Sequence, residues 1–241
     1  MKTKPLHRLQ EIILFEDDHL VLVNKPVGTA SLDDKSQRNL NELARSYHPE
    51  LRLCHRLDKN TSGVLLMAKG LDIYRTMAMQ FEHREVQKTY LTLVAGIHRF
   101  EAKMIDLPLL ISTNKKVSVS HKYGKPAETV VDTEEIFRHY TLLRCQPVTG
   151  RMHQIRIHLA ETGTPVVGDA LYGGQDILLS ELKRRYKMST RKDEQPLNHG
   201  YLLHAHKLRF THPASGEPMD IEAPLSDNFE ATLKVLRKYD Q

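Results

Sequence analysis

The densest group of polar side chains lies in segment 55–63, which reads His-Arg-Leu-Asp-Lys-Asn-Thr-Ser-Gly. It runs directly into the apolar stretch 64–67, and polar groups at the mouth of a buried strand are a common setting for binding and catalysis. The neighbouring arginine and lysine favour the ionised form of Asp58, which suits a nucleophile or an electrostatic partner better than a general acid. The alternative is an Asx turn, in which Asp58 accepts hydrogen bonds from the backbone two or three residues further on.

A second polar cluster spans 149–158 and reads Thr-Gly-Arg-Met-His-Gln-Ile-Arg-Ile-His. The spacing predicts a helix over 151–162, stopped by Gly163 and Pro165, with an apolar face of Met152, Ile155 and Leu159. Arg156 flanks this face, and an unpaired buried charge is very costly. It therefore needs an anionic partner, for which Asp58 is the natural candidate.

Neither a metal nor a nucleotide cofactor is expected. His153 and His158 are five residues apart, which is not the spacing of a helical zinc pair, and the chain has no Cys-x-x-Cys motif. His204 and His206 alternate along an expected strand and could share a ligand, but two histidines alone do not make a zinc site. No glycine-rich phosphate-binding loop of standard spacing is present.

Composition places the chain among globular proteins. Its 241 residues are 40% hydrophobic and 27% charged, which excludes collagen, coiled coils and wholesale disorder. No apolar run approaches the ~20 residues of a membrane span, and the N-terminus lacks the apolar region of a secretory signal. Two cysteines cannot form a disulfide framework, so a cytoplasmic location is expected. The net charge of +5 is a weak sign of a polyanionic partner, strengthened by a basic run at 183–192, whose alternative is a solvated surface segment.

The elements that must position these residues are short strands with helices interspersed. Strands are predicted at 12–15, 20–23, 64–67, 90–94, 117–120, 129–132, 141–145 and 202–210. Apolar spacing predicts further helices over 40–47, over 74–81 and around 229–236. This irregular mixture indicates an α+β fold with a mostly antiparallel sheet and flanking helices.

Segment 55–63 resembles the HRLDxxTSG signature of the RluA-type RNA pseudouridine synthases. Four further segments match that family in the right order, namely Asn-Lys-Pro at 24–26, the Lys-x-Tyr strand at 88–96, the TGRxHQIRxHL…GDxxYG block at 149–173 and the C-terminal strand motif from 203 to 224. Together they cover nearly all of the chain from about residue 12 to residue 229. The resemblance implies a mixed, mostly antiparallel sheet of the pseudouridine synthase type with a central active-site cleft.

The resemblance also implies an isomerase that converts uridine in RNA to pseudouridine without cofactor or metal. Asp58 matches the essential aspartate, and it would attack the uracil, attack the sugar or abstract a sugar proton. Tyr90 would stack on the target base and help to remove its C5 proton, or else be an ordinary strand aromatic. Arg156 would pair with Asp58.

Further matching residues are expected to bind substrate. Arg56 would fill the space left when the uridine is flipped out, and Ile155 would pack on the base as well as on the core. His55 and Thr61 of the signature are assigned to substrate binding with them. Lys88 and Arg151 would either contact RNA phosphates or only form ion pairs with neighbouring residues.

The chain departs from many relatives at its start, because only about eleven residues precede the first strand and no S4 RNA-binding domain is expected. We therefore expect residues 1–241 to form one catalytic domain that acts as a monomer, without a membrane or an obligate protein partner. Its partner would be ribosomal or transfer RNA, which the family signature does not distinguish.

Two other functions remain open. The first is a catalytically inactive RNA-binding module. The second is an aspartyl-phosphate phosphotransferase built on residues 58–61, which would need more acidic residues for magnesium than Asp169 supplies.

Overall fold

The computed structural model describes residues 8–32, 39–113, 116–183, 186 and 194–241. The chain divides into two compact units, one from residues 1–90 and 204–226 and the other from residues 91–203 and 227–241. Each unit has strands, helices and a buried apolar cluster of its own. The single catalytic domain expected for residues 1–241 stays a prediction.

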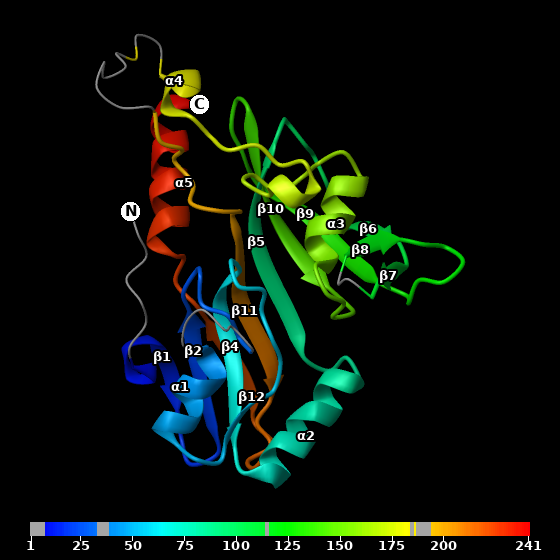
Figure 1. Ribbon diagram of the computed structural model, residues 1–241, viewed down its shortest axis with the longest axis vertical. Helices are drawn as coiled ribbons and strands as arrows, with labels where there is room; N and C mark the ends of the chain where they lie inside the picture. The colour runs from blue at the N-terminus through cyan, green and yellow to red at the C-terminus, as the bar shows by residue number, and fades with distance from the viewer. Residues whose placement is uncertain (1–7, 33–38, 114–115, 184–185, 187–193) are drawn as a thin grey trace. The chain divides into compact units, whose positions relative to one another are not determined.

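The first unit is built on a mixed sheet with the strand order β1-β2-β4-β11-β12 (Figure 1). All neighbours are antiparallel except β4 and β11, and β3 adds an antiparallel strand to β4. The strands are β1 (Ile13–Glu16), β2 (Leu20–Lys25), β3 (Leu51–Leu53), β4 (Ser62–Lys69), β11 (Leu203–Thr211) and β12 (Pro218–Glu222). The helices are η1 (Leu9–Ile12), α1 (Leu40–Tyr47) and α2 (Leu71–Glu82).

The central strands β2 and β4 are buried along almost their whole length, which explains their continuous apolar sequences. Helix α1 begins where the side chain of Asn39 accepts a hydrogen bond from the Glu42 backbone N–H, and it ends just before Pro49. Helix α2 packs against β4. The unit therefore presents a rigid sheet whose β3–β4 connection carries segment 55–61.

The second unit contains a sheet with the strand order β5-β10-β9-β6 and a separate β7–β8 hairpin. Its strands are β5 (Gln87–Ala95), which enters from the first unit, and β6 (Lys103–Asp106), β7 (Leu109–Ile111), β8 (Val117–Val119), β9 (Glu128–Ile136) and β10 (Tyr140–Pro147). Its helices are α3 (Gln154–Glu161), η2 (Ala170–Tyr172), α4 (Leu179–Leu182) and α5 (Asp227–Tyr239).

All eight predicted strands are confirmed, and the α+β class with mostly antiparallel pairing is confirmed with them. The predicted helices at 40–47, 74–81 and 229–236 correspond to α1, α2 and α5. Strands β3, β6 and β7 were missed because three or four residues carry too little periodicity, and β12 was missed because it begins with proline. Of the basic run 183–192, only Lys183 and Tyr186 lie within the described residues.

The helix predicted over 151–162 was wrong at its start and in its faces. Helix α3 begins at Gln154, because His153 before it adopts a left-handed backbone conformation with φ of 55°. Every residue from Gln154 to Leu159 is buried, polar ones included, so the helix has no solvated face over that stretch. Met152, expected on its apolar face, precedes the helix.

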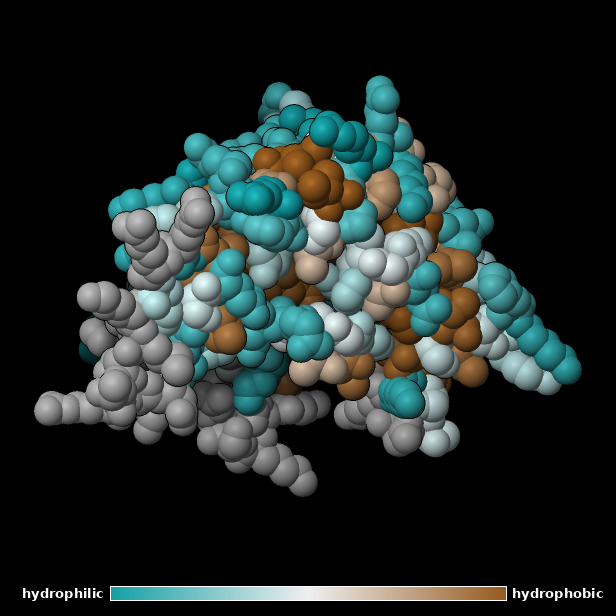
Figure 2. Space-filling model, turned by 90° about the horizontal axis from the view of Figure 1, so that it is seen from above, coloured by the Kyte–Doolittle hydropathy of each residue, from teal (hydrophilic) through white to brown (hydrophobic). Residues whose placement is uncertain are grey.

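The face shown in Figure 2 is mainly hydrophilic, with small apolar patches between charged and polar residues. The exposed large apolar side chains are spread over several elements, among them Met79 of α2, Met104 of β6 and Leu171 of η2. Scattered apolar residues of this kind are usual on protein surfaces. Among the helices that the structure describes, none has the length and apolarity needed to cross a membrane.

Gly63 is required where β4 runs beside β11. Its φ is +112°, and a Cβ placed on it would lie 2.1 Å from the carbonyl oxygen of Ala205, its partner in the parallel pairing. Both the backbone conformation and the approach of the neighbouring strand exclude a side chain at this position.

We expect Gly63→Ala to lower the free energy of unfolding by more than about 3 kcal/mol, since strand β11 must shift to accept the new methyl group. Gly216→Ala is the matched control, because Gly216 also has positive φ, of +76°, but open space around it. It should cost only about 1 kcal/mol, the strain of a left-handed alanine. Equal losses in urea unfolding of the two variants would contradict the role assigned to Gly63.

Candidate active site

Asp58 lies in a tight turn that ends the connection from β3 to β4. The backbone N–H of Thr61 donates to the carbonyl oxygen of Asp58 at 3.1 Å, which closes the turn just before β4 begins. Leu57 is buried, and Ser31 holds it on both sides, its hydroxyl donating to the Leu57 carbonyl at 2.7 Å and accepting from the Leu57 N–H at 3.1 Å. The chain on either side of Asp58 is therefore fixed, while its side chain remains half-buried.

A buried lysine supports the same turn from the end of β2. Lys25 is fully buried, and its Nζ donates to the carbonyl oxygens of Pro26, Thr29 and Lys59 at 3.1, 2.8 and 3.1 Å. Burial lowers the pKa of Lys25 to about 7, and the negative charge of Asp58 acts in the opposite direction. Lys25 thus supports the residue after Asp58 through a hydrogen bond, and the Asp58 charge favours the protonated form of Lys25.

Tyr90 on β5 also responds to the charge of Asp58. Burial and then the Asp58 charge raise the pKa of the half-buried Tyr90 phenol well above its ordinary value. The phenol is therefore protonated at neutral pH, with an aromatic face and a hydroxyl donor. The first unit thus gathers the predicted residues Asp58 and Tyr90 around a cation, Lys25, that was quoted only as part of a matching motif.

His55 has a structural contact that the sequence did not reveal. Its Nε2 accepts a hydrogen bond from the backbone N–H of Leu66 at 3.0 Å, and its ring lies 5.0 Å from that of Phe81. Burial, and then the positive charge of Lys88, lower the pKa of His55 to about 3. The imidazole is therefore neutral, and its predicted contact with substrate stays a prediction.

The other predicted substrate-binding residues of the first unit differ in exposure. Arg56 is exposed, Lys88 is half-buried and Thr61 is buried. Burial and the nearby Arg84 charge lower the pKa of Lys88 to about 8. Exposed Arg56 is accessible to a large ligand, whereas Thr61 is part of the turn that positions Asp58.

In the second unit, the turn before α3 is organised by the side chain of Gln154. Its Oε1 accepts from the Thr149 hydroxyl at 2.6 Å and from the Arg151 N–H at 3.0 Å, while its Nε2 donates to the Glu128 carbonyl at 2.8 Å. Arg151, which was predicted to bind substrate, is half-buried, and its Nε donates to the carbonyl of Pro126 at 3.2 Å. This contact is structural, and a contact of Arg151 with RNA stays a prediction.

Arg156 is buried, and it is held by Asp169, which the sequence analysis considered only as a magnesium ligand of the phosphotransferase alternative. Its Nε and Nη2 donate to the two carboxylate oxygens of Asp169 at 2.6 and 2.8 Å, and both side chains are less than a tenth exposed. The guanidinium also lies over the rings of Tyr172 and Tyr201, 5.0 and 4.2 Å from their centroids. Asp169 thus satisfies the need for an anion, and the predicted pairing of Arg156 with Asp58 stays a prediction.

Ile155, next to Arg156 on α3, is buried with 6% of its surface exposed. Its core role is therefore confirmed, and packing on a base stays a prediction. Within the described part of the chain, no three His, Cys, Asp or Glu side chains gather as they would around a metal ion.

Reasoning from the sequence did not predict the structural roles of Lys25 and Asp169. Each lies inside a matched motif, Asn-Lys-Pro at 24–26 and Gly-Asp at 168–169. Lys25 follows the apolar run 20–23 and Asn24, and a charged residue at the end of a strongly apolar strand is the signal that could have identified it.

Comparison with known proteins identifies one family. Residues 19–161 match the family model described as RNA pseudouridylate synthase. The chain is 37% identical to ribosomal large subunit pseudouridine synthase C of Vibrio vulnificus, over 98% of this chain and 72% of that protein. It is 39% identical to the protein of the same name from Escherichia coli, over 95% of this chain and 71% of that protein. The solved structure of human RNA Pseudouridylate Synthase Domain Containing 4 is similar with a TM-score of 0.74 at 27% identity, over 95% of this chain and 94% of that one.

The Arg156–Asp169 pair predicts a large loss of stability when only one partner is changed. We expect Asp169→Asn to lower the free energy of unfolding by about 3 kcal/mol, because the buried guanidinium loses its bidentate counter-charge. Glu135→Gln is the control, since Glu135 forms a similar bidentate pair with Arg237 at an exposed site. That change should cost less than about 1 kcal/mol in urea unfolding, and equal losses would refute the special role of the buried pair.

The low pKa of His55 predicts sensitivity to acid. Between its folded pKa of about 3 and its ordinary value of 6.5, the unfolded chain binds more protons, so stability falls as the pH decreases through this window. From about pH 7 to about pH 5 the wild type should lose about 2 kcal/mol more than His55→Gln, whose side-chain carbonyl can accept the same hydrogen bond. Urea unfolding at both pH values measures this, with His121→Gln at an exposed histidine as control. A variant with the same acid sensitivity as the wild type would contradict the assignment.

Proposed function

We propose that this chain, which belongs to the RNA pseudouridylate synthase family, isomerises uridine in large-subunit ribosomal RNA and uses Asp58 to act on the target nucleotide. Its membership makes it an RNA pseudouridine synthase and an isomerase. The proposal therefore concerns the RNA and the roles of individual residues. The ribosomal substrate is favoured by the names of the bacterial relatives.

The observation that carries the proposal is the arrangement around Asp58. Its carboxylate stands in a braced turn at the start of a buried strand, and its charge acts on both Lys25 and Tyr90. A fixed anion beside a cation and a protonated phenol supplies a reactive carboxylate, an aromatic surface and a hydrogen-bond donor together. This combination suits a reaction on a uracil base.

The reaction breaks the bond between N1 of uracil and C1′ of ribose and forms a bond between C5 and C1′. C5 loses a proton and N1 gains one, so the atoms of substrate and product balance. The ionised Asp58 can attack the base, attack the sugar or take a proton from the sugar, and each route needs a carboxylate held in place.

Tyr90 is proposed to stack on the target base and later to accept the C5 proton. With Asp58 ionised, the pKa of Tyr90 is raised, and the phenol remains protonated. When the Asp58 carboxylate is neutralised by bonding or by protonation, one of the two causes of that raised pKa disappears. Tyr90 then gives up its phenolic proton more easily, and only after that proton has passed to the base, which gains one at N1, can the phenolate accept the proton from C5.

Arg56 is proposed to enter the space vacated by the flipped uridine, since it is exposed and only two residues from Asp58. Arg156 is proposed to position Asp58 when RNA is bound. Its bidentate pair with Asp169 fixes the plane of its guanidinium within the second unit.

Replacing Asp58 tests the proposal. Asp58→Asn preserves the size of the side chain but removes its charge, so we expect pseudouridine formation to fall by at least about a thousandfold while RNA affinity changes by less than about threefold. Tritium release from ribosomal RNA labelled at C5 of uridine measures turnover, and filter binding measures affinity. Asp72→Asn is the matched control, because Asp72 is an exposed carboxylate on α2.

Turnover retained by Asp58→Asn would overturn the role of Asp58. A wild-type enzyme that modifies transfer RNA and leaves ribosomal RNA unmodified would overturn the choice of substrate. A wild-type enzyme that binds RNA but modifies neither would restore the reading as an RNA-binding module.

A further inference from the structure

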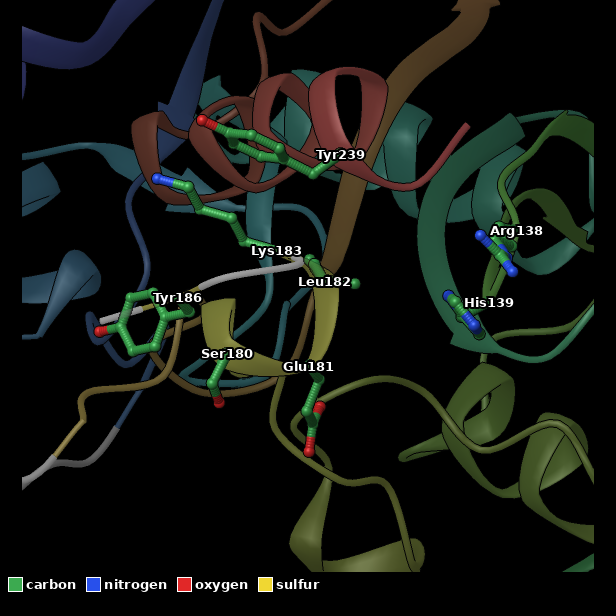
Figure 3. A pocket seen from close by; sticks show the side chains of 8 residues that line it. All are labelled: Arg138, His139, Ser180, Glu181, Leu182, Lys183, Tyr186 and Tyr239. Atoms are coloured by element: carbon green, nitrogen blue, oxygen red, sulfur yellow. The ribbon is translucent and has the colours of Figure 1, made fainter. Parts of the chain in front are cut away.

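A pocket in the second unit is not used by the proposed reaction. It has a volume of about 560 Å³ and lies between the β9–β10 turn, helix α4 and the C-terminal end of α5 (Figure 3). Eight residues line it: Arg138, His139, Ser180, Glu181, Leu182, Lys183, Tyr186 and Tyr239. A volume of this size accommodates a ligand as large as a nucleotide.

Basic groups and an aromatic ring are combined at this pocket. The Nζ of Lys183 lies 5.7 Å from the ring centroid of Tyr239, and the Nζ of Lys238 lies 5.2 Å from it. In Figure 3 the Lys183 side chain extends toward Tyr239, while Arg138 projects from the opposite wall. Cations around a half-buried aromatic ring resemble the surfaces on which single-stranded nucleic acids stack their bases.

The acidic groups at the pocket do not cancel this basic character. Asp240 is buried, and its carboxylate accepts from the backbone N–H of His139 at 3.0 Å and bonds the His139 ring at 2.5 Å. Glu181 extends from α4 away from Tyr239 in Figure 3. The exposed charges of Arg138 and Lys183 therefore remain available to an anion.

Two walls of the pocket, the β9–β10 turn and the end of α5, are joined by hydrogen bonds. The backbone N–H of Arg138 donates to the carbonyl of Asp240 at 2.7 Å, which joins the β9–β10 turn to the residue after α5. One turn earlier, the guanidinium of Arg237 binds both carboxylate oxygens of Glu135 on β9, with Nη2 2.7 Å from Oε2. Binding then costs less conformational entropy, because these two walls are already ordered.

We propose that this pocket binds a single-stranded segment of the substrate RNA outside the target nucleotide. One base stacks on Tyr239, and Arg138 and Lys183 neutralise the phosphates on either side of it. The inference rests on the proposed function for its RNA ligand. It adds a second point of attachment on residues that take no part in the chemistry.

Binding of a fluorescein-labelled single-stranded oligouridine to the full chain, measured by fluorescence anisotropy over a series of salt concentrations, tests the proposal. Tyr239→Ala should weaken binding about tenfold through loss of one stacked base, whereas Tyr239→Phe should stay within about twofold of the wild type. The double change Arg138→Gln with Lys183→Gln should reduce the slope of log K against log salt by about 1.4, or about 0.7 for each lost phosphate contact. Lys234→Gln, on the same helix but outside the pocket, is the matched control and should change neither quantity.

Tritium release measured on the same variants separates this inference from the proposed function. If the wild type forms pseudouridine and binds the oligouridine, but the pocket variants bind as it does, the pocket is overturned and the function stands. If the wild type binds but forms no pseudouridine while Tyr239→Ala weakens binding, the pocket stands and the function is overturned. Equal weakening by Tyr239→Ala and Tyr239→Phe would overturn stacking, as would failure of the wild type to bind the oligouridine.

Discussion

The position of Asp58 depends on a buried ammonium group. Removing the Lys25 charge from water costs several kcal/mol, and three carbonyl oxygens together with the Asp58 charge offset part of that cost, since burial still lowers the pKa of Lys25 to about 7. Two of these carbonyls belong to the loop after β2 and the third to Lys59, so one side chain ties two distant loops together. The Gly28 N–H, which donates to the same Lys59 carbonyl at 2.9 Å, strengthens this link. The turn that carries Asp58 is therefore fixed by hydrogen bonds to backbone groups of a distant loop.

The second unit also contains a buried cation, but its charge is compensated differently. Arg156 is buried on α3, and its charge is balanced by a bidentate carboxylate and two aromatic rings. The planar guanidinium suits this fixed geometry, whereas the compact ammonium of Lys25 suits a cage of carbonyl oxygens. In both units a cation in a poorly solvated place determines how the chain around it must fold. Removing one partner leaves an uncompensated charge, which makes these positions intolerant of substitution.

Features that depend on neighbouring residues could be predicted from the sequence, whereas contacts between residues far apart in the chain could not. The strands could be predicted because their pattern is local, as in the continuous apolar run of β4. Asp58, Tyr90 and Arg156 were identified through motifs that match a known family. The partners of buried charges could not be predicted, since Lys25 meets Lys59 across 34 residues and Arg156 meets Asp169 across 13. The start of α3 was misplaced because the Gln154 side chain, polar yet buried, closes the preceding turn through contacts up to 26 residues away.

The charge of Asp58 also orders the steps of the proposed reaction. While the carboxylate is ionised it raises the pKa of Tyr90 and opposes the effect of burial on Lys25. Neutralising it lowers the pKa of both groups, so the phenol gives up its proton more easily and the ammonium is held less tightly. The Tyr90 phenol must lose its own proton before it can take the one from C5, and that loss is easier once Asp58 has been neutralised. The group proposed to start the reaction therefore influences the acidity of the group proposed to help complete it.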